Sequence, residues 1–177
     1  MSNVLEFAKR FANAGFYVFP LYDSRNGLQK PFGWAGNKPK DDVDPKKIIP
    51  CTRDVREIEK WPDRIQEGYN STLAHFGVMG IGHVIFDLDN KDGKNGSAQF
   101  KQLREKFNIP EPQSVVKSKS GGGHPCCAKP EKLANHQLKT LSNVTTAGTK
   151  YEGVDLRGDG GMVLGPTCEG PIDSWEP

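Results

Sequence analysis

The sequence lacks a long hydrophobic run. None of its 177 residues falls in a stretch of about 18 consecutive apolar residues, which is the length that a membrane-spanning helix requires. The N-terminus also lacks the apolar segment that is typical of a secretory signal peptide. These absences exclude a predicted membrane anchor, so we expect a cytoplasmic protein with no membrane partner.

Cysteine is scarce, and its spacing is unlike that of a zinc site. Cys51, Cys126, Cys127 and Cys168 form no C-x-x-C pair and have no histidine at the spacing of a zinc finger. We therefore expect no structural zinc and reduced thiols. Cys126 and Cys127 are interpreted as strand residues rather than as a site.

A strong excess of charge of one sign is also missing. The formal net charge is +2, so basicity alone does not indicate a nucleic-acid-binding protein. Several basic residues lie in a proline-rich stretch, which suits either a phosphate-binding surface or a solvated loop. They are Lys30, Lys38, Lys40, Lys46, Lys47 and Arg53. No repeat or linker divides the chain, and its length suggests a single domain over residues 1–177.

The most informative segment is an acidic strand end. Residues 82–90 read Gly-His-Val-Ile-Phe-Asp-Leu-Asp-Asn, which is typical of a buried strand. Because side chains alternate along a strand, Asp87 and Asp89 lie on one face and Leu88 lies on the other. Two neighbouring carboxylates repel each other, and a divalent cation bound by their oxygens relieves this. A metal site and a plain acidic turn both fit this segment.

Residues 113–124 have the composition of a phosphate-binding loop. A short apolar strand leads into three glycines and a histidine. Glycines let backbone amides approach a polyanion closely, although a flexible turn is the alternative for such a run. The loop adds donors suited to phosphate oxygens, namely Ser118, Lys119, Ser120 and His124.

Residues 153–166 present a third carboxylate beside a cation. Apolar residues alternate with Asp155 and Arg157, and glycines then lead into a second apolar run. This pattern predicts a hairpin that carries Asp155 and Arg157 on one face.

In this order, the segments resemble the bifunctional primase-polymerase (prim-pol) domain of the archaeo-eukaryotic primase superfamily, which occurs in plasmid and phage replication proteins. The resemblance rests on hhhDhD at 84–89, S-G-G-x-H at 120–124 and G-V-D-hydrophobic-R-G at 153–158. Residues 8–21 resemble the opening helix and VFPL strand of the family. Thr52, Asp54, Ile58 and Trp61 resemble its T-x-D…I…W segment.

The chain departs from the family pattern after the histidine. Pro125-Cys126-Cys127 stands where the family has an aromatic pair on a strand, and the closing pattern near Trp175 lacks its tyrosine. Because proline removes a backbone donor, we expect this strand at a sheet edge or beginning after Pro125.

The resemblance implies an α+β fold, namely the archaeo-eukaryotic primase (prim-pol) fold, with an RRM-like catalytic mixed sheet, packed helices and an N-terminal α/β unit. Residue patterns predict helices over 4–14, 54–61 and 97–107, with Asp54 and Ser97 as N-caps. They predict strands over 16–21, 75–79 and 83–89, of which the last two form a pair. Further strands are expected near Val115, Cys126, Asn143, Asp155 and Val163.

The resemblance also implies template-directed nucleotidyl transfer by a DNA polymerase, a DNA primase or both, with two Mg²⁺ or Mn²⁺ ions. Asp87, Asp89 and Asp155 are then the metal ligands, because hard oxygen donors suit hard cations. His124 joins them as a catalytic residue. The triphosphate-binding group is Ser118, Lys119, Ser120, Gly122, His124 and Arg157. In this interpretation neither His124 nor Arg157 contacts the metal.

Expected partners are a single-stranded or primed DNA template and a dNTP or NTP. The resemblance implies a fragment of a larger replication protein that carries a helicase or a helical priming domain, in a bacterial, archaeal or phage-infected cell. One alternative is a metal-dependent nuclease or phosphohydrolase that uses the same carboxylates with water. The other is a non-catalytic RRM-like nucleic-acid-binding module, which is disfavoured because the candidate face carries carboxylates that repel phosphate.

Overall fold

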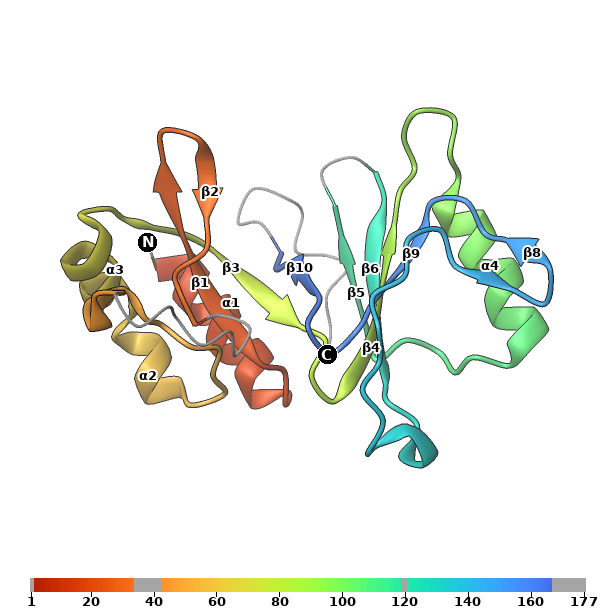
Figure 1. The fold of residues 1–177 in the computed structure, drawn as a ribbon, viewed down its shortest axis with the longest axis horizontal. Helices are drawn as coiled ribbons and strands as arrows, with labels where there is room; N and C mark the ends of the chain where they lie inside the picture. The colour runs from red at the N-terminus through yellow and green to blue at the C-terminus, as the bar shows by residue number, and fades with distance from the viewer. Residues whose placement is uncertain (1, 34–42, 119–120, 167–177) are drawn as a thin grey trace. The chain divides into compact units, whose positions relative to one another are not determined.

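The computed structural model describes residues 2–33, 43–118 and 121–166. Helices and antiparallel strands form two compact units, Met1–Met79 and Gly80–Pro177 (Figure 1). This confirms the α+β class. Within the described ranges, no helix has both the length and the apolar character needed to cross a membrane.

The first unit packs three helices with a small sheet. Its elements are α1 (Ser2–Asn13), β1 (Val18–Ser24), β2 (Gly27–Gln29), the 3-10 helix η1 (Pro45–Lys47), α2 (Val55–Glu59), α3 (Trp61–Tyr69) and β3 (Leu73–Met79). β1 pairs antiparallel with both β2 and β3. α1 buries Phe7 and Phe11 on one face and ends before Gly15, whose positive φ of 93° suits glycine, so the predicted first helix is confirmed.

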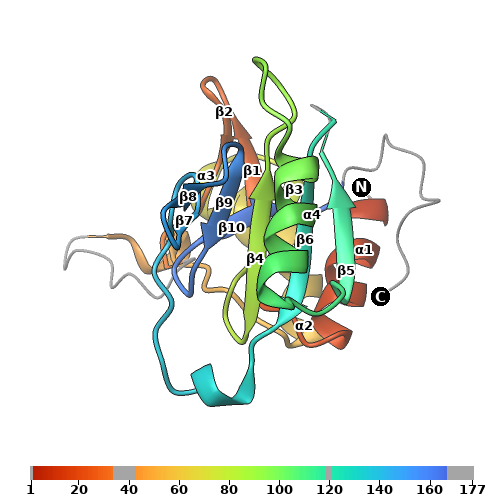
Figure 2. The same cartoon turned by 90° about the vertical axis from the view of Figure 1, so that its right-hand side faces the viewer.

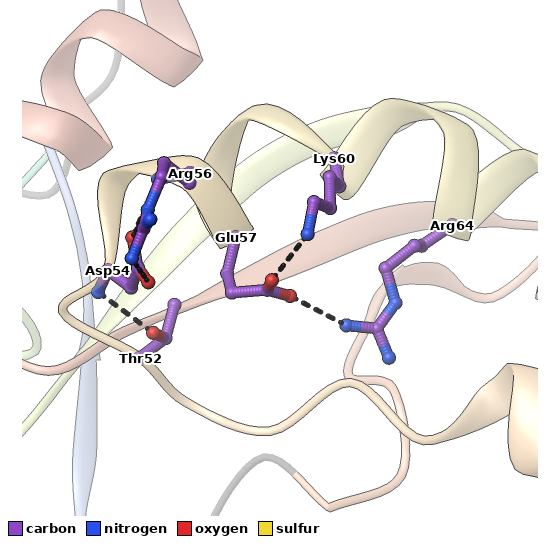
Figure 3. Close-up of polar contacts among 6 residues, drawn as sticks. All are labelled: Thr52, Asp54, Arg56, Glu57, Lys60 and Arg64. Atoms are coloured by element: carbon purple, nitrogen blue, oxygen red, sulfur yellow. Dashed lines mark hydrogen bonds and ion pairs between the residues drawn. The ribbon is translucent and has the colours of Figure 1, made fainter.

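The T-x-D segment of the first unit is a helix cap (Figure 3). The backbone amide of Asp54 donates to Thr52 Oγ1 at 2.9 Å, and Asp54 Oδ1 accepts from the amide of Arg56 at 2.9 Å. Asp54 is therefore the N-cap of α2, as predicted. Trp61 is the first residue of α3 and not the last residue of α2. The predicted helix 54–61 therefore covers parts of two helices, which meet at Lys60.

The second unit is built on a sheet with the order β5-β6-β4-β9. Its elements are β4 (His83–Leu88), α4 (Gly96–Phe107), β5 (Ser114–Lys117), β6 (Gly123–Ala128), the 3-10 helix η2 (Glu131–Leu133), β7 (Thr145–Thr146), β8 (Thr149–Lys150), β9 (Val154–Arg157) and β10 (Met162–Leu164). All three pairings in this four-stranded sheet are antiparallel, so it is not the mixed sheet that the resemblance implied.

α4 covers one face of this sheet (Figure 2). Phe100 and Leu103 of α4 pack in one buried cluster with Phe86 and Leu88 of β4. The helix was predicted, but its N-cap is Asn95 rather than Ser97. Phe107, its last residue, is 42% exposed. Because strand side chains alternate, the neighbours of Phe86 and Leu88 point to the opposite face of the sheet.

Both predicted hairpins are wrong. β3 pairs with β1, whereas β4 pairs with β6 and β9. β9 lies beside β4, and the described sheet that contains it does not include β10. The strand expected near Asn143 is β7, which begins at Thr145, while Asn143 itself has a left-handed φ of 47°. For both hairpins, a turn signal was taken as evidence that the two flanking strands pair with each other, whereas in the structure each strand pairs with a different neighbour.

Pro125 lies in a central strand, contrary to the prediction of an edge. β6 runs from Gly123 to Ala128 between β5 and β4. Its pairing with β4 joins Ile85 to Cys126 and then Leu88 to Gly123. The ladder between β4 and β6 has no pairs between these two, and Pro125 lies in the gap. The missing N–H of the proline is therefore accommodated by a local interruption of the pairing.

Candidate active site

Three adjacent strands bring the charged residues of the site together. In the pairing of β4 with β9, Asp87 lies directly opposite Asp155. The register of β4 with β6 pairs Leu88 with Gly123, and it therefore aligns His124 with Asp87. These side chains lie on the face of the sheet opposite to α4, because Phe86 and Leu88 point towards that helix. Residues far apart in the sequence thus meet on one face.

Arg157 and His124 both contact the carboxylate of Asp87. The Arg157 guanidinium donates through Nε to Asp87 Oδ2 at 3.2 Å, and its Nη2 contacts the same oxygen. Nη2 also lies 3.3 Å from Asp155 Oδ2. On the other side, His124 Nε2 lies 3.3 Å from Asp87 Oδ1. Both groups that were expected to bind phosphate therefore contact a predicted metal ligand.

These contacts keep Asp87 ionised. Burial raises the pKa of the Asp87 carboxyl, but hydrogen bonds and positive charge from His124 and Arg157 outweigh it and lower the pKa to about 2. Opposite charges within about 4–6 Å typically have this effect on a carboxyl group. Asp87 is therefore a carboxylate at neutral pH.

Asp155 is oriented by Asn143. The backbone amide of Asn143 donates to Asp155 Oδ1 at 2.8 Å, and the side-chain oxygen of Asn143 accepts from the amide of Gly153 at 3.0 Å. Asparagine suits this position because it tolerates left-handed φ and bonds to nearby backbone. Reasoning from the sequence expected a strand near Asn143 and did not identify this residue as part of the site.

Asp89 is anchored through its backbone. Its amide donates to the carbonyl of Gly153 at 2.8 Å, and its carbonyl accepts from the amide of Gly96 at 2.9 Å. A Cβ at Gly96 would lie 2.3 Å from the oxygen of Gly153, so the close approach needs glycine. The side chain of Asp89 is 35% exposed, and its oxygen lies 4.0 Å from Lys91 Nζ. It is the most open of the three carboxylates.

The glycine loop is held against the end of β4. A Cβ at Gly122 would lie only 1.8 Å from the carbonyl oxygen of Leu88, which explains the glycine there by close packing. Asn90 donates to the carbonyl of Gly121 at 2.8 Å and accepts from the amide of Ser97 at 3.0 Å. Asn90 therefore connects this loop to the start of α4, a role that the sequence interpretation missed.

The outcome for the remaining loop residues is mixed. Ser118 lies at the base of the loop, where its amide donates to the carbonyl of Gly122 at 3.1 Å. Lys119 and Ser120, which were predicted to bind the triphosphate, lie outside the described residues.

Cys126 and Cys127 are strand residues in β6, and burial raises their thiol pKa values to about 12 and about 11.

The donor chemistry of the site suits a hard divalent cation. Carboxylate oxygens are the ligands that Mg²⁺ and Mn²⁺ prefer, and Asp87 and Asp155 already lie side by side. Among the described residues, no group of three or more acidic, histidine or cysteine side chains is gathered closely enough to hold a metal. The guanidinium of Arg157 contacts both carboxylates instead, and His124 Nε2 lies beside Asp87.

The fold and the site together define a class of protein: an α+β domain with an acidic and basic cluster on one face of an antiparallel sheet. The family described as "Bifunctional DNA primase/polymerase, N-terminal" matches residues 8–172. The chain therefore belongs to this family, which supports a primase or polymerase role in DNA replication. Comparison with curated proteins found no match.

Proposed function

We propose that this chain is a template-directed nucleotidyltransferase that starts or extends DNA strands with two divalent cations in plasmid or phage replication. The observation that carries the proposal is the convergence of Asp87, Asp155, His124 and Arg157 on one face of the sheet, in a chain that belongs to the primase/polymerase family. Its substrates are a dNTP or NTP and a single-stranded or primed DNA template.

Asp87, Asp89 and Asp155 would hold Mg²⁺ or Mn²⁺. When bound, such ions supply activation of the attacking hydroxyl and neutralisation of charge on the leaving pyrophosphate. The chain's own groups do the remaining work. Asn143 fixes the direction of the Asp155 carboxylate, while Arg157 would provide positive charge for the triphosphate and His124 a hydrogen bond.

His124 has an atom left for such a contact. The residue is only 9% exposed, its Nε2 faces Asp87, and its buried Nδ1 has no hydrogen-bond partner among the residues that the structure describes. A buried polar atom without a partner is unfavourable. With Nε2 donating to Asp87, Nδ1 of the neutral ring would accept from a water or a ligand donor, and Nδ1 of the protonated ring would donate to a ligand oxygen. This supports a ligand at the histidine end of the site.

The test is an extension assay with primed and unprimed templates, each with dNTPs or NTPs and with Mg²⁺ or Mn²⁺. Asp87→Asn and Asp155→Asn should abolish product formation. Asp63→Asn makes the same substitution at an exposed position of α3 and serves as the matched control, with activity expected at the wild-type level. Substantial extension by both site variants would refute the assignment. Primer degradation without extension would favour the nuclease alternative.

A further inference from the structure

One nitrogen of Arg157 lies between the carboxylates of Asp87 and Asp155. Its Nη2 contacts Oδ2 of Asp87 and lies 3.3 Å from Oδ2 of Asp155, which is the carboxylate directly opposite. A divalent cation that bridges two carboxylates contacts one oxygen of each, at about 2.0–2.6 Å. The guanidinium and such a cation therefore compete for the same pair of oxygens.

The other oxygen of each carboxylate already has a separate partner. Asp87 Oδ1 faces His124 Nε2 at 3.3 Å, and Asp155 Oδ1 accepts from the amide of Asn143 at 2.8 Å. The remaining oxygens, Oδ2 of Asp87 and Oδ2 of Asp155, both face Arg157, whose side chain is only 28% exposed. A cation that enters between the carboxylates has to take the oxygens that Arg157 holds.

We propose that Arg157 acts as a placeholder for the bridging metal: it neutralises Asp87 and Asp155 in the metal-free protein and is displaced from them when a divalent cation binds. The inference rests on the proposed function, since it concerns the same carboxylates. Arg157 is then a positioning residue for the metal-free site, and its like charge is what the entering cation has to overcome.

Displacement links metal binding to nucleotide binding. A guanidinium that has lost its two carboxylates lies beside the metal without an anionic partner, and the phosphate of a nucleotide supplies one. A nucleotide therefore favours the displaced arginine and raises the affinity for metal. By thermodynamic reciprocity, the metal raises the affinity for nucleotide by the same factor.

The test is calorimetric titration of Mn²⁺ into the metal-free chain, first without and then with saturating nucleotide. Without nucleotide, Arg157→Gln should bind Mn²⁺ about 10-fold or more tightly than wild type, because a charge-assisted contact no longer competes. The gain in Mn²⁺ affinity on adding nucleotide should be smaller in Arg157→Gln than in wild type. Arg157→Lys keeps a positive charge at the site and should stay closer to wild type.

The matched control is Arg104→Gln, which removes the same charge from α4, where Arg104 pairs with Glu111 at 2.6 Å. Its Mn²⁺ affinity should equal that of wild type. Unchanged or weaker Mn²⁺ binding by Arg157→Gln would overturn the displacement, even if the wild type extends primers. Tighter binding by Arg157→Gln together with a wild type that never extends primers would support the displacement and overturn the polymerase assignment.

Discussion

The charge contacts of Asp87 make a prediction about stability that can be worked out in numbers. Considered only as one of two neighbouring carboxylates, Asp87 destabilises the metal-free protein, and Asp87→Asn is expected to relieve repulsion. The structure reverses this expectation, because Arg157 and His124 both contact Asp87. We therefore expect Asp87→Asn to lower the free energy of unfolding in the absence of metal.

The magnitude follows from the pKa of Asp87, which falls from the ordinary 3.8 to about 2 in the folded protein. One pKa unit corresponds to about 1.36 kcal/mol, so ionised Asp87 stabilises the fold by about 2 kcal/mol relative to its protonated form. The side chain is 25% exposed, so solvent screens these contacts only partly. Asparagine keeps an acceptor oxygen but loses the charge, and the expected loss is about 2 kcal/mol.

The pH dependence has a definite sign. Because the folded pKa lies below the unfolded one, the contribution is complete above about pH 5 and is lost as the pH falls through 3.8 towards 2. The difference in unfolding free energy between wild type and Asp87→Asn should therefore be largest at pH 7 and about half as large near pH 3.

The assay is urea unfolding with a chelator present, since urea, unlike guanidinium chloride, does not screen charge. Asp89→Asn is the matched control just beyond the end of β4, and it should change stability less, because its ion-pair partner among the described residues, Lys91, lies 4.0 Å away. If Asp87→Asn is as stable as wild type or more stable at pH 7, repulsion dominates and the reasoning is wrong.

Three further predictions concern other parts of the second unit. His124→Ala should weaken nucleotide binding at saturating Mn²⁺ by roughly 10- to 150-fold, which corresponds to the loss of one charge-assisted hydrogen bond. Calorimetry measures this affinity, and unchanged binding would show that His124 is not part of the nucleotide site. Gly122→Ala should destabilise the fold more than Gly121→Ala. A Cβ at Gly122 meets the Leu88 carbonyl at 1.8 Å, whereas a Cβ at Gly121 meets open space and costs only the strain of its positive φ of 79°. Equal unfolding midpoints in urea would contradict the packing argument. Elemental analysis should find far less than one zinc per chain, and stoichiometric zinc that disappears in Cys126→Ser would show that the cysteine spacing was misread.

Reasoning from the sequence was most successful where a local pattern decides the outcome. The alternation in 82–90 correctly placed Asp87 on the face opposite to Leu88, because the period of two is a property of any strand. The Asp54 cap was correct for the same reason, since a side-chain oxygen bonds an amide two residues ahead. The charged residues on β4, β6 and β9 were all identified by their motifs.

Local sequence patterns do not determine which strands pair with each other, and this was the part of the fold that was predicted wrongly. Nothing in residues 75–89 distinguishes a hairpin from two strands that pair elsewhere, and the same holds for 153–166. Asn143 and Asn90 were missed for a related reason: each acts on residues brought near by the fold, such as Asp155 and Gly121. The contact of Arg157 with Asp87, 70 residues away, follows only from the register of β4 with β9.

The position of β4 in the sheet explains why Asp87 differs from the other two carboxylates. β4 is flanked by β6 on one side and by β9 on the other, so a side chain near its C-terminal end has neighbours from both strands. Asp87 accordingly meets His124 from β6 and Arg157 from β9. Asp155 meets Arg157 of its own strand, and Asp89 lies beyond the end of β4. A change in charge at Asp87 therefore affects both His124 and Arg157, the two groups that we assign to the triphosphate, whereas a change at Asp89 leaves these contacts intact.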